Sequence, residues 1–275
     1  MIKDIVVNLP IDDGHHTADY AISVASTFHA HIAGIAFTND MALPITMMDG
    51  ISPELIQASR RESNQAAKAA LEHFANAAGR ADLAAETRAP IADFAGVADQ
   101  FARIARCFDL AVLGQADPHK ISPEGVIVET ALFGSGRPII IVPYIQKQGL
   151  KLDRVVICWD GSRAAARATA DAMPFLTRAT NVEVLIVVNR SGEGEEIDTA
   201  DIAQHLDRHA IVTEIKRIVA TDLDVATTIL SHVADAAADF LVMGGYGHSR
   251  LREFVLGGVT RSILKSMTVP VLMSH

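Results

Sequence analysis

The chain has 275 residues, of which 49% are hydrophobic, and its formal net charge is −9 at pH 7. This apolar content is ample for one large domain or two of ordinary size, and it argues against a disordered chain. The acidic balance, with a pI near 5.6, excludes a general nucleic-acid or anionic-membrane binder, because such proteins need a basic face.

Cysteine content and the N-terminal sequence indicate the compartment. Two cysteines, Cys107 and Cys158, are too few for a disulfide framework and favour a reducing environment. The first residues reach Asp4, Pro10 and Asp12 too soon for the apolar region of a signal peptide. No run approaches the roughly 18–20 apolar residues of a membrane-spanning helix. We therefore expect a cytoplasmic protein that binds neither membrane nor nucleic acid.

Hydrophobic periodicity predicts alternating strands and helices along the first half of the chain. Strands are expected at 5–9, 31–37, 83–88, 109–114 and 137–143, and helices at 16–28, 52–78, 94–107 and 126–132. The second half repeats this order. Its strands are expected at 154–159, 182–188, 212–219, 239–244 and 269–273, and its helices at 163–176, 195–209, 222–238 and 259–267.

The repeat is visible in residues as well as in element order. Asp109-Leu-Ala-Val-Leu-Gly114 parallels Asp239-Phe-Leu-Val-Met-Gly244, with an acid, apolar residues and a closing glycine. A strand–helix series of this kind predicts an α/β fold, here two tandem five-stranded, mostly parallel open sheets with helices on both faces. We place the boundary near Gly149, which gives domains at 1–149 and 150–275.

The last strand of each repeat is apolar throughout, although it would be an edge strand of an open sheet. An exposed apolar edge is an aggregation hazard that folded proteins usually cover. Pairing the strand Ile139–Val142 with Val269–Met273 would cover both edges. The sequence therefore predicts that the two halves pair as a pseudo-two-fold dimer.

A glycine-rich stretch follows the fourth strand of the second repeat. Gly244 and Gly247 are followed, after nine residues, by Gly257-Gly258 at the start of a helix. Bare backbone N–H groups and a helix N-terminus suit an anion, and we expect this stretch to bind a phosphate chain. The alternative is a tight turn followed by an ordinary helix start.

These residues resemble the nucleotide-binding signature of the universal stress proteins. That family has Gly, two residues, Gly, nine residues, Gly and then Ser or Thr, and an Asp-Gly-Ser turn that matches Asp160-Gly161-Ser162. The closing strand also matches, so the chain resembles a tandem universal stress protein with a HUP/Rossmann-like fold. The resemblance implies an adenine-nucleotide site formed by Asp160, Val187, Val188, Gly244, Gly247, Gly257, Gly258 and Val259.

The resemblance also implies a role for each of these residues. Asp160 would accept hydrogen bonds from ribose or adenine, and the backbone at Val187 and Val188 would meet the adenine. Gly244 and Gly247 would let the loop approach ribose and phosphate. The phosphates would receive N–H groups from Gly257, Gly258 and Val259, and we hypothesise that Arg250 and Arg252 add positive charge.

Two departures bear on this site. The hydroxyl residue of the family is Gly258 here, and a lost hydrogen bond to a charged group is worth roughly 1.5–3 kcal/mol, or about tenfold in affinity. In the first repeat, the positions of Gly247, Gly257 and Gly258 carry Asp117, Ile127 and Val128. A carboxylate there would repel phosphate, so we expect the first repeat to hold no nucleotide.

The function implied is that of a stress-response protein that binds ATP or AMP, with or without Mg²⁺, at one site in the C-terminal domain. It would act through a conformational or partner-binding change on an unidentified protein. Two alternatives are a scaffold whose site has decayed and a slow ATPase. The sequence contains no P-loop, nucleophile elbow or zinc-type histidine spacing, so we assign no catalytic or metal-binding residue. Asp160 alone fits an ordinary helix-capping turn equally well.

Overall fold

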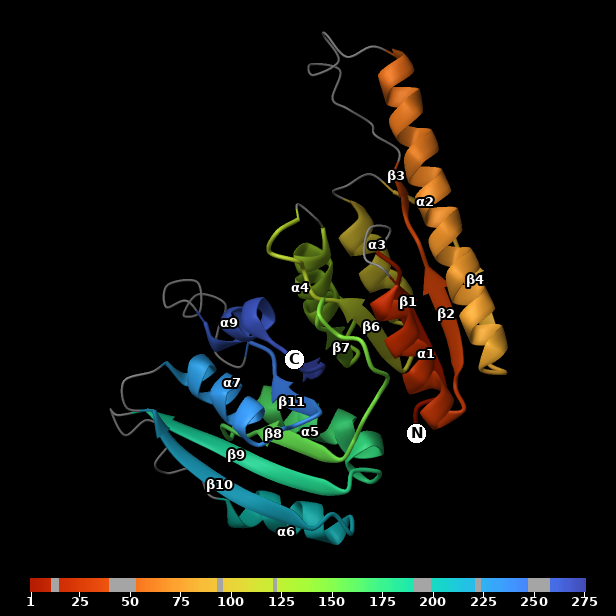
Figure 1. Ribbon diagram of the computed structural model, residues 1–275. Coiled ribbons are helices and arrows are strands. Elements are labelled where there is room, and N and C mark those ends of the chain that lie inside the picture. The colour runs from red at the N-terminus through yellow and green to blue at the C-terminus, as the bar shows by residue number, and fades with distance from the viewer. Residues whose placement is uncertain are drawn as a thin grey trace. The chain divides into compact units, whose positions relative to one another are not determined.

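A computed structural model (Figure 1) describes residues 1–10, 15–39, 53–92, 96–120, 123–189, 199–220, 224–246 and 258–275. These residues form two compact units. The N-terminal unit comprises Ile2–Arg137 and Lys147–Gly149, and the C-terminal unit comprises Met1, Pro138–Gln146 and Leu150–His275. The domain boundary near Gly149 stays a prediction. None of the helices in the described ranges is long and apolar enough to cross a membrane.

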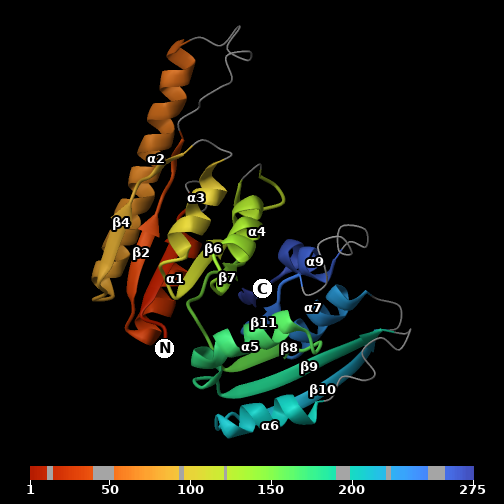
Figure 2. The same cartoon turned by 180° about the vertical axis from the view of Figure 1, so that it is seen from behind.

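The N-terminal unit is built on a parallel sheet with the strand order β6-β1-β2-β4. Its elements in chain order are β1 (Asp4–Asn8), α1 (His16–Phe28), β2 (His31–Ile35), β3 (Thr38–Asn39), α2 (Pro53–Arg80), β4 (Ala85–Arg88), β5 (Ile91–Ala92), α3 (Gly96–Ala105), β6 (Leu110–Gly114) and α4 (Glu124–Gly134). Helices α3 and α4 pack side by side (Figure 2). The two-residue strands β3 and β5 pair with each other in a small parallel sheet, which the sequence did not predict.

The C-terminal unit contains a six-membered strand series in the order β10-β9-β8-β11-β12-β7. Its elements are β7 (Ile139–Val142), β8 (Arg154–Cys158), α5 (Arg163–Leu176), β9 (Asn181–Asn189), α6 (Ala200–Arg208), β10 (Thr213–Ala220), α7 (Val225–Asp235), β11 (Phe240–Gly244), α9 (Val259–Ser266) and β12 (Val271–Ser274). Right-handed crossovers place α5 and α6 on one face and α7 and α9 on the other, and α7 and α9 lie side by side (Figures 1 and 2). The predicted mostly parallel α/β fold is confirmed.

Buried apolar strands supply the core of each unit. All four residues of β7 and the strand residues Val155–Ile157 are fully buried, as continuous apolar runs in parallel sheets usually are. In the C-terminal unit Phe175 of α5 stacks on Phe240 of β11 with ring centroids 5.3 Å apart.

Helix α7 begins at Val225, later than predicted, because the Asp224 carboxylate accepts the Thr227 N–H at 2.9 Å and caps the helix. That hydrogen bond lowers the pKa of Asp224.

The last strand of the chain pairs with the last strand of the first repeat, as predicted. β12 and β7 run antiparallel, with Val271 opposite Ile141 and Met273 opposite Ile139. This pairing is the reason that Pro138–Gln146 groups with the C-terminal unit. Both apolar strands thereby lose an exposed edge.

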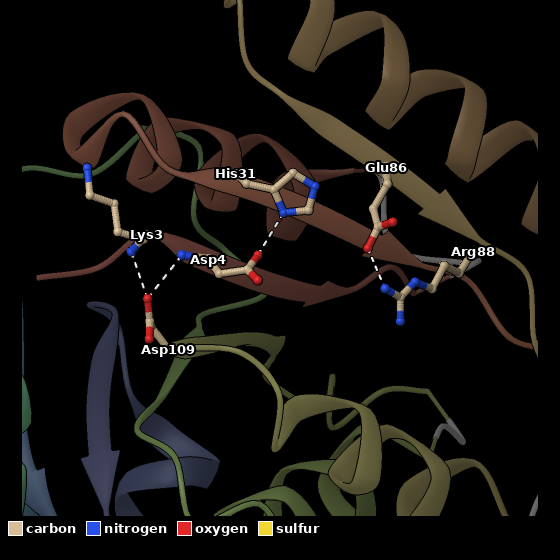
Figure 3. Close-up of polar contacts among 6 residues, drawn as sticks. All are labelled: Lys3, Asp4, His31, Glu86, Arg88 and Asp109. Carbon is tan, nitrogen blue, oxygen red and sulfur yellow. Dashed lines mark hydrogen bonds and ion pairs between the residues drawn. The ribbon is translucent and has the colours of Figure 1, made fainter.

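The repeated acid before β6 and β11 fixes the start of a neighbouring strand. Asp109 Oδ2 accepts the backbone N–H groups of Lys3 at 2.8 Å and Asp4 at 3.1 Å (Figure 3). In the second repeat Asp239 Oδ2 accepts the Arg154 N–H at 2.9 Å. The first N–H groups of β1 and β8 therefore find the same side-chain acceptor in both repeats, which explains the acid in the repeated sequence.

We expect Asp239→Ala to lower the free energy of unfolding of the C-terminal unit by about 1–3 kcal/mol, because the part-buried Arg154 N–H then lacks its acceptor. Urea unfolding followed by the fluorescence of Trp159, the only tryptophan of the chain, measures this. Asp207→Ala, at an exposed position of α6, is the control and should change stability by less than about 0.5 kcal/mol. Equal effects of the two substitutions would contradict the assigned role.

Candidate nucleotide site

The candidate site lies where the strand order of the C-terminal unit reverses. From β8 the chain moves outward through β9 and β10, and it then returns to β11 and β12 on the other side of β8. All these strands are parallel, so their carboxyl ends share one edge of the sheet. Ligands of open α/β sheets bind at such a reversal, beyond the carboxyl ends of the strands. Asp160 follows β8, and Gly244 ends β11.

Asp160 begins a turn that leads into α5. Its Oδ1 accepts the Ser162 N–H at 2.9 Å, and Gly161 adopts the left-handed conformation with φ +72°. Ser162 Oγ then accepts the Ala165 N–H at 3.1 Å and caps the helix. Asp-Gly-Ser therefore forms the helix-capping turn that was one interpretation of this sequence. The Asp160 side chain remains exposed, and its Oδ2 has no hydrogen-bond partner among the described residues.

The strand register determines which backbone groups of β9 face the site. Leu185 O accepts the Trp159 N–H at 2.9 Å, so Leu185 is directed to β8. Direction alternates along a strand, so Val187 is also directed to that side, beyond the point where β8 ends at Cys158. Val188 is directed to β10, where it lies opposite Val219, and its side chain is buried. Of the two predicted residues, Val187 is the one whose N–H and C=O point toward the loop of Asp160.

Gly244 has a packing role that the sequence did not reveal. A Cβ atom at this position would lie 2.5 Å from the Ala165 N and 2.6 Å from the Ala164 C. Glycine is therefore required for the end of β11 to pass the first turn of α5, whether or not a ligand is bound. The approach fixes β11 against the helix that Ser162 caps, and so it holds the loops after β8 and β11 close together.

Gly258 and Val259 lie at the N-terminus of α9. Gly258 is the N-cap residue, with φ −54° and ψ 147°, and Val259 is the first helical residue. N–H groups in this first turn lack partners within the helix and point outward, as an anion site requires. The Thr260 hydroxyl accepts the Tyr246 N–H at 3.1 Å and is buried, so it ties the loop after β11 to α9 and does not replace the hydroxyl missing at position 258.

Part of the predicted site lies outside the described residues. Gly247, Gly257, Arg250 and Arg252 all fall between the described ranges 224–246 and 258–275. The structure therefore brings together Asp160, Val187, Gly244, Gly258 and Val259 at one edge of the sheet. The assignment of all eight residues to a nucleotide stays a prediction.

The positions of the first repeat that correspond to Gly247, Gly257 and Gly258 lie in a turn and in a helix. Asp117 Oδ1 accepts the His119 N–H at 2.9 Å and Asp117 O accepts the Lys120 N–H at 3.0 Å, so this residue forms a turn. Ile127 and Val128 are buried within α4, which already begins at Glu124. The Ile127 N–H donates to Pro123 O at 2.9 Å. An amide used in this way inside a helix is not available to a phosphate.

Sequence reasoning missed a buried hydrogen bond between a carboxylate and a histidine. Glu183 of β9 is 6% exposed, and its Oε1 pairs with Nε2 of His232 on α7. An acid inside the apolar run 182–188 was the available signal, because acids are rarely buried unless paired. Its partner could not be identified, since the helix packing that supplies His232 is a tertiary contact.

The thiol of Cys158, at the end of β8, has a raised pKa. Burial raises the pKa most, and with the added effect of the negative charges of Asp160 and Glu183 it reaches about 12. A thiol with this pKa stays neutral at physiological pH and is a poor nucleophile.

Among the described residues, no group of three or more His, Cys, Asp or Glu side chains is placed to hold a metal ion.

Comparisons with known proteins agree with this architecture. The model of the universal stress protein family matches residues 151–275. Universal stress protein Slr1230 of Synechocystis sp. is 24% identical over 174 residues, which cover 60% of this chain and only 57% of that relative. A universal stress protein from Archaeoglobus fulgidus superposes with a TM-score of 0.70 at 19% identity, covering 98% of this chain and 95% of the other. A putative universal stress protein from Pseudomonas aeruginosa gives a TM-score of 0.64 at 12% identity, covering 99% and 93%. The predicted family resemblance is confirmed.

We expect Gly244→Ala to destabilise the C-terminal unit by about 1–3 kcal/mol, because its Cβ would overlap the backbone of Ala164 and Ala165. Thermal unfolding without nucleotide is the measurement. Gly79→Ala is a matched control: nothing lies within 4 Å of the added Cβ in helix α2, so it should be neutral or slightly stabilising. Unchanged stability of Gly244→Ala would show that the close approach is absent.

We expect a thiol reagent at pH 8 to label the exposed Cys107 and to leave Cys158 unmodified in the folded protein. The pKa of about 12 keeps the Cys158 thiol neutral, and the thiolate is the reactive form. Mass spectrometry after iodoacetamide treatment counts the adducts, and the same reaction in urea should give two. Rapid folded-state labelling of Cys158 in a Cys107→Ser variant would refute the raised pKa.

Proposed function

We propose that the C-terminal domain, whose residues 151–275 match the model of the universal stress protein family, binds an adenine nucleotide, ATP or AMP. The observation that carries the proposal is the meeting of three different groups at one sheet edge. These groups are the exposed carboxylate of Asp160, the outward-directed backbone of Val187 and the helix N-terminus at Gly258.

The chemistry of these groups matches the parts of a nucleotide. An adenine edge presents a donor beside an acceptor, and the N–H and C=O of Val187 complement both. Asp160 Oδ2 is an acceptor for a ribose hydroxyl or a base N–H. First-turn amides at Val259, together with the helix dipole, favour phosphate oxygens. Any Mg²⁺ would be held largely by the phosphates, as is usual for this ion.

Binding at this position suggests how the nucleotide signals. The Tyr246 N–H and the Thr260 hydroxyl join the loop after β11 to the first turn of α9. A ligand held between Val259 and Asp160 would shift the position of this loop relative to α5. We infer a stress-response protein that acts through a nucleotide-linked change in conformation or in binding to a protein partner. A ligand can produce such a change only if it favours one of the two states.

The N-terminal repeat is proposed to hold no nucleotide. Its α4 begins before Ile127, and the Ile127 amide is used within the helix. Asp117 forms a turn at the position where the second repeat has Gly247. The protein would then bind one nucleotide per chain.

Calorimetric titration with ATP and AMP, with and without Mg²⁺, tests this proposal. We expect one nucleotide per chain, and Asp160→Asn should weaken binding about tenfold or more, because it keeps the Oδ1 acceptor of the turn and removes the charge. Asp117→Asn is the matched control in the first repeat and should leave binding unchanged. Gly258→Ser should strengthen binding about tenfold, since serine tolerates φ −54° and ψ 147° and restores the missing hydroxyl.

The other functions give different results in the same titration. Absence of heat and of a thermal shift at millimolar nucleotide, together with no gain from Gly258→Ser, would favour a scaffold with a decayed site. Phosphate release that Asp160→Asn removes would indicate a slow ATPase. Gly247→Asp copies the charge of the first repeat, and binding that survives it would refute the site.

A further inference from the structure

The edge strand β10 exposes apolar side chains to solvent. Ile215 and Val219 of β10 are 36% and 55% exposed, and Val212, just before the strand, is 86% exposed. No described strand pairs with the outer side of β10. A long strand of this kind is a template for pairing with another chain, and folded proteins usually blunt or cover it. β10 is eight residues long and is in register with β9 over its whole length.

The edge strand β4 of the N-terminal unit has two features that discourage pairing with another chain, and β10 lacks both. β4 has four residues, and its charged side chains Glu86 and Arg88 form an ion pair with each other (Figure 3). In β10 the charged side chains Glu214 and Lys216 have the same two-residue spacing and are exposed, but no ion pair within the described chain joins them. Their charges are available to a partner.

The register fixes which backbone groups face the open side of β10. Leu185 is directed to β8, where it accepts the Trp159 N–H, so its neighbour Val184 is directed to β10. Val184 lies opposite Ile215, and in a parallel ladder it bonds the residues on either side of Ile215. The N–H and C=O of Ile215 itself are therefore directed to the open edge.

We propose that β10 pairs antiparallel with β10 of a second copy of this chain, about a two-fold axis at Ile215. Each Glu214 then lies opposite Lys216 of the partner subunit, and each Val212 lies opposite Ile218 of the partner subunit. The two Ile215 residues form a hydrogen-bonded pair at the centre. The strand is thus self-complementary in charge and in apolar character, as a two-fold interface requires.

Other registers are less favourable. The outward-directed residues alternate, so the axis must pass through a residue and not between two residues. An axis at Glu214, Lys216 or Arg217 would place two like charges directly opposite each other, which destabilises a sheet. Of these four central positions, only Ile215 sets opposite charges against each other. This specificity favours a second copy over an unrelated strand.

The oligomeric state of the full chain tests the proposal. Light scattering after gel filtration, at micromolar protein, should give the mass of two 29.4 kDa chains. Lys216→Glu places two glutamates opposite each other at both symmetric positions and should raise the dimer Kd about 10- to 100-fold. Glu214→Lys should do the same, and the double variant Glu214→Lys/Lys216→Glu should restore the dimer. Both side chains are exposed, and thermal unfolding verifies that each variant is folded.

Controls separate this interface from others. Lys151→Glu makes the same change in charge at an exposed position away from β10 and should leave the dimer intact. In a Cys107→Ser background, Ile215→Cys should form an intersubunit disulfide with oxidised glutathione, because hydrogen-bonded pairs have Cα atoms about 5.5 Å apart. Arg217→Cys should not, since the two copies of that position lie about 14 Å apart. A monomeric wild-type chain, or a dimer that Lys216→Glu does not weaken, would overturn the proposal.

Discussion

The antiparallel pairing of β12 with β7 is the contact on which the C-terminal unit depends. Every residue of both strands is buried, and each strand would otherwise present an unpaired apolar edge. Fully burying one aliphatic side chain stabilises a fold by about 1.5–3 kcal/mol, so several such side chains outweigh the usual net stability of a domain. Strand β7 of the first repeat therefore extends the five strands of the second repeat to a series of six and covers the apolar edge of β12. Asp160 and Gly244 lie at the carboxyl ends of strands in this sheet, so its packing fixes their positions.

The two repeats share a skeleton but differ at the loops. Asp109 and Asp239 bind the first N–H groups of β1 and β8 in the same way, so selection for folding explains this part of the repeat. The loops after β6 and β11 lead to helices that begin differently. One of them leads to a helix that begins at Glu124, and the other leads to a helix capped by Gly258. Function can diverge in loops while the sheet below them stays the same.

The sequence alone was sufficient to predict most helices and strands and the fold class. Long apolar runs and helical periodicity can be recognised in the sequence without the structure. The strands β3 and β5 were missed, since two residues each carry no period. Three details of the site needed the tertiary structure. The requirement for Gly244 comes from the approach of α5, and the pair of Glu183 and His232 joins a strand to a distant helix. The choice of Val187 over Val188 depends on the register with β8.

The early start of α4 makes the difference between the repeats hard to reverse. If glycines replaced Asp117, Ile127 and Val128, the backbone would still follow the helix that Pro123 O closes with the Ile127 N–H. Point substitutions change side chains, whereas a site here would need several residues of helix to unwind into a loop. If the proposed function is correct, a nucleotide site in the first repeat would need an insertion or deletion between β6 and α4. A single substitution that removed the proposed site of the second repeat would then leave the chain without a site.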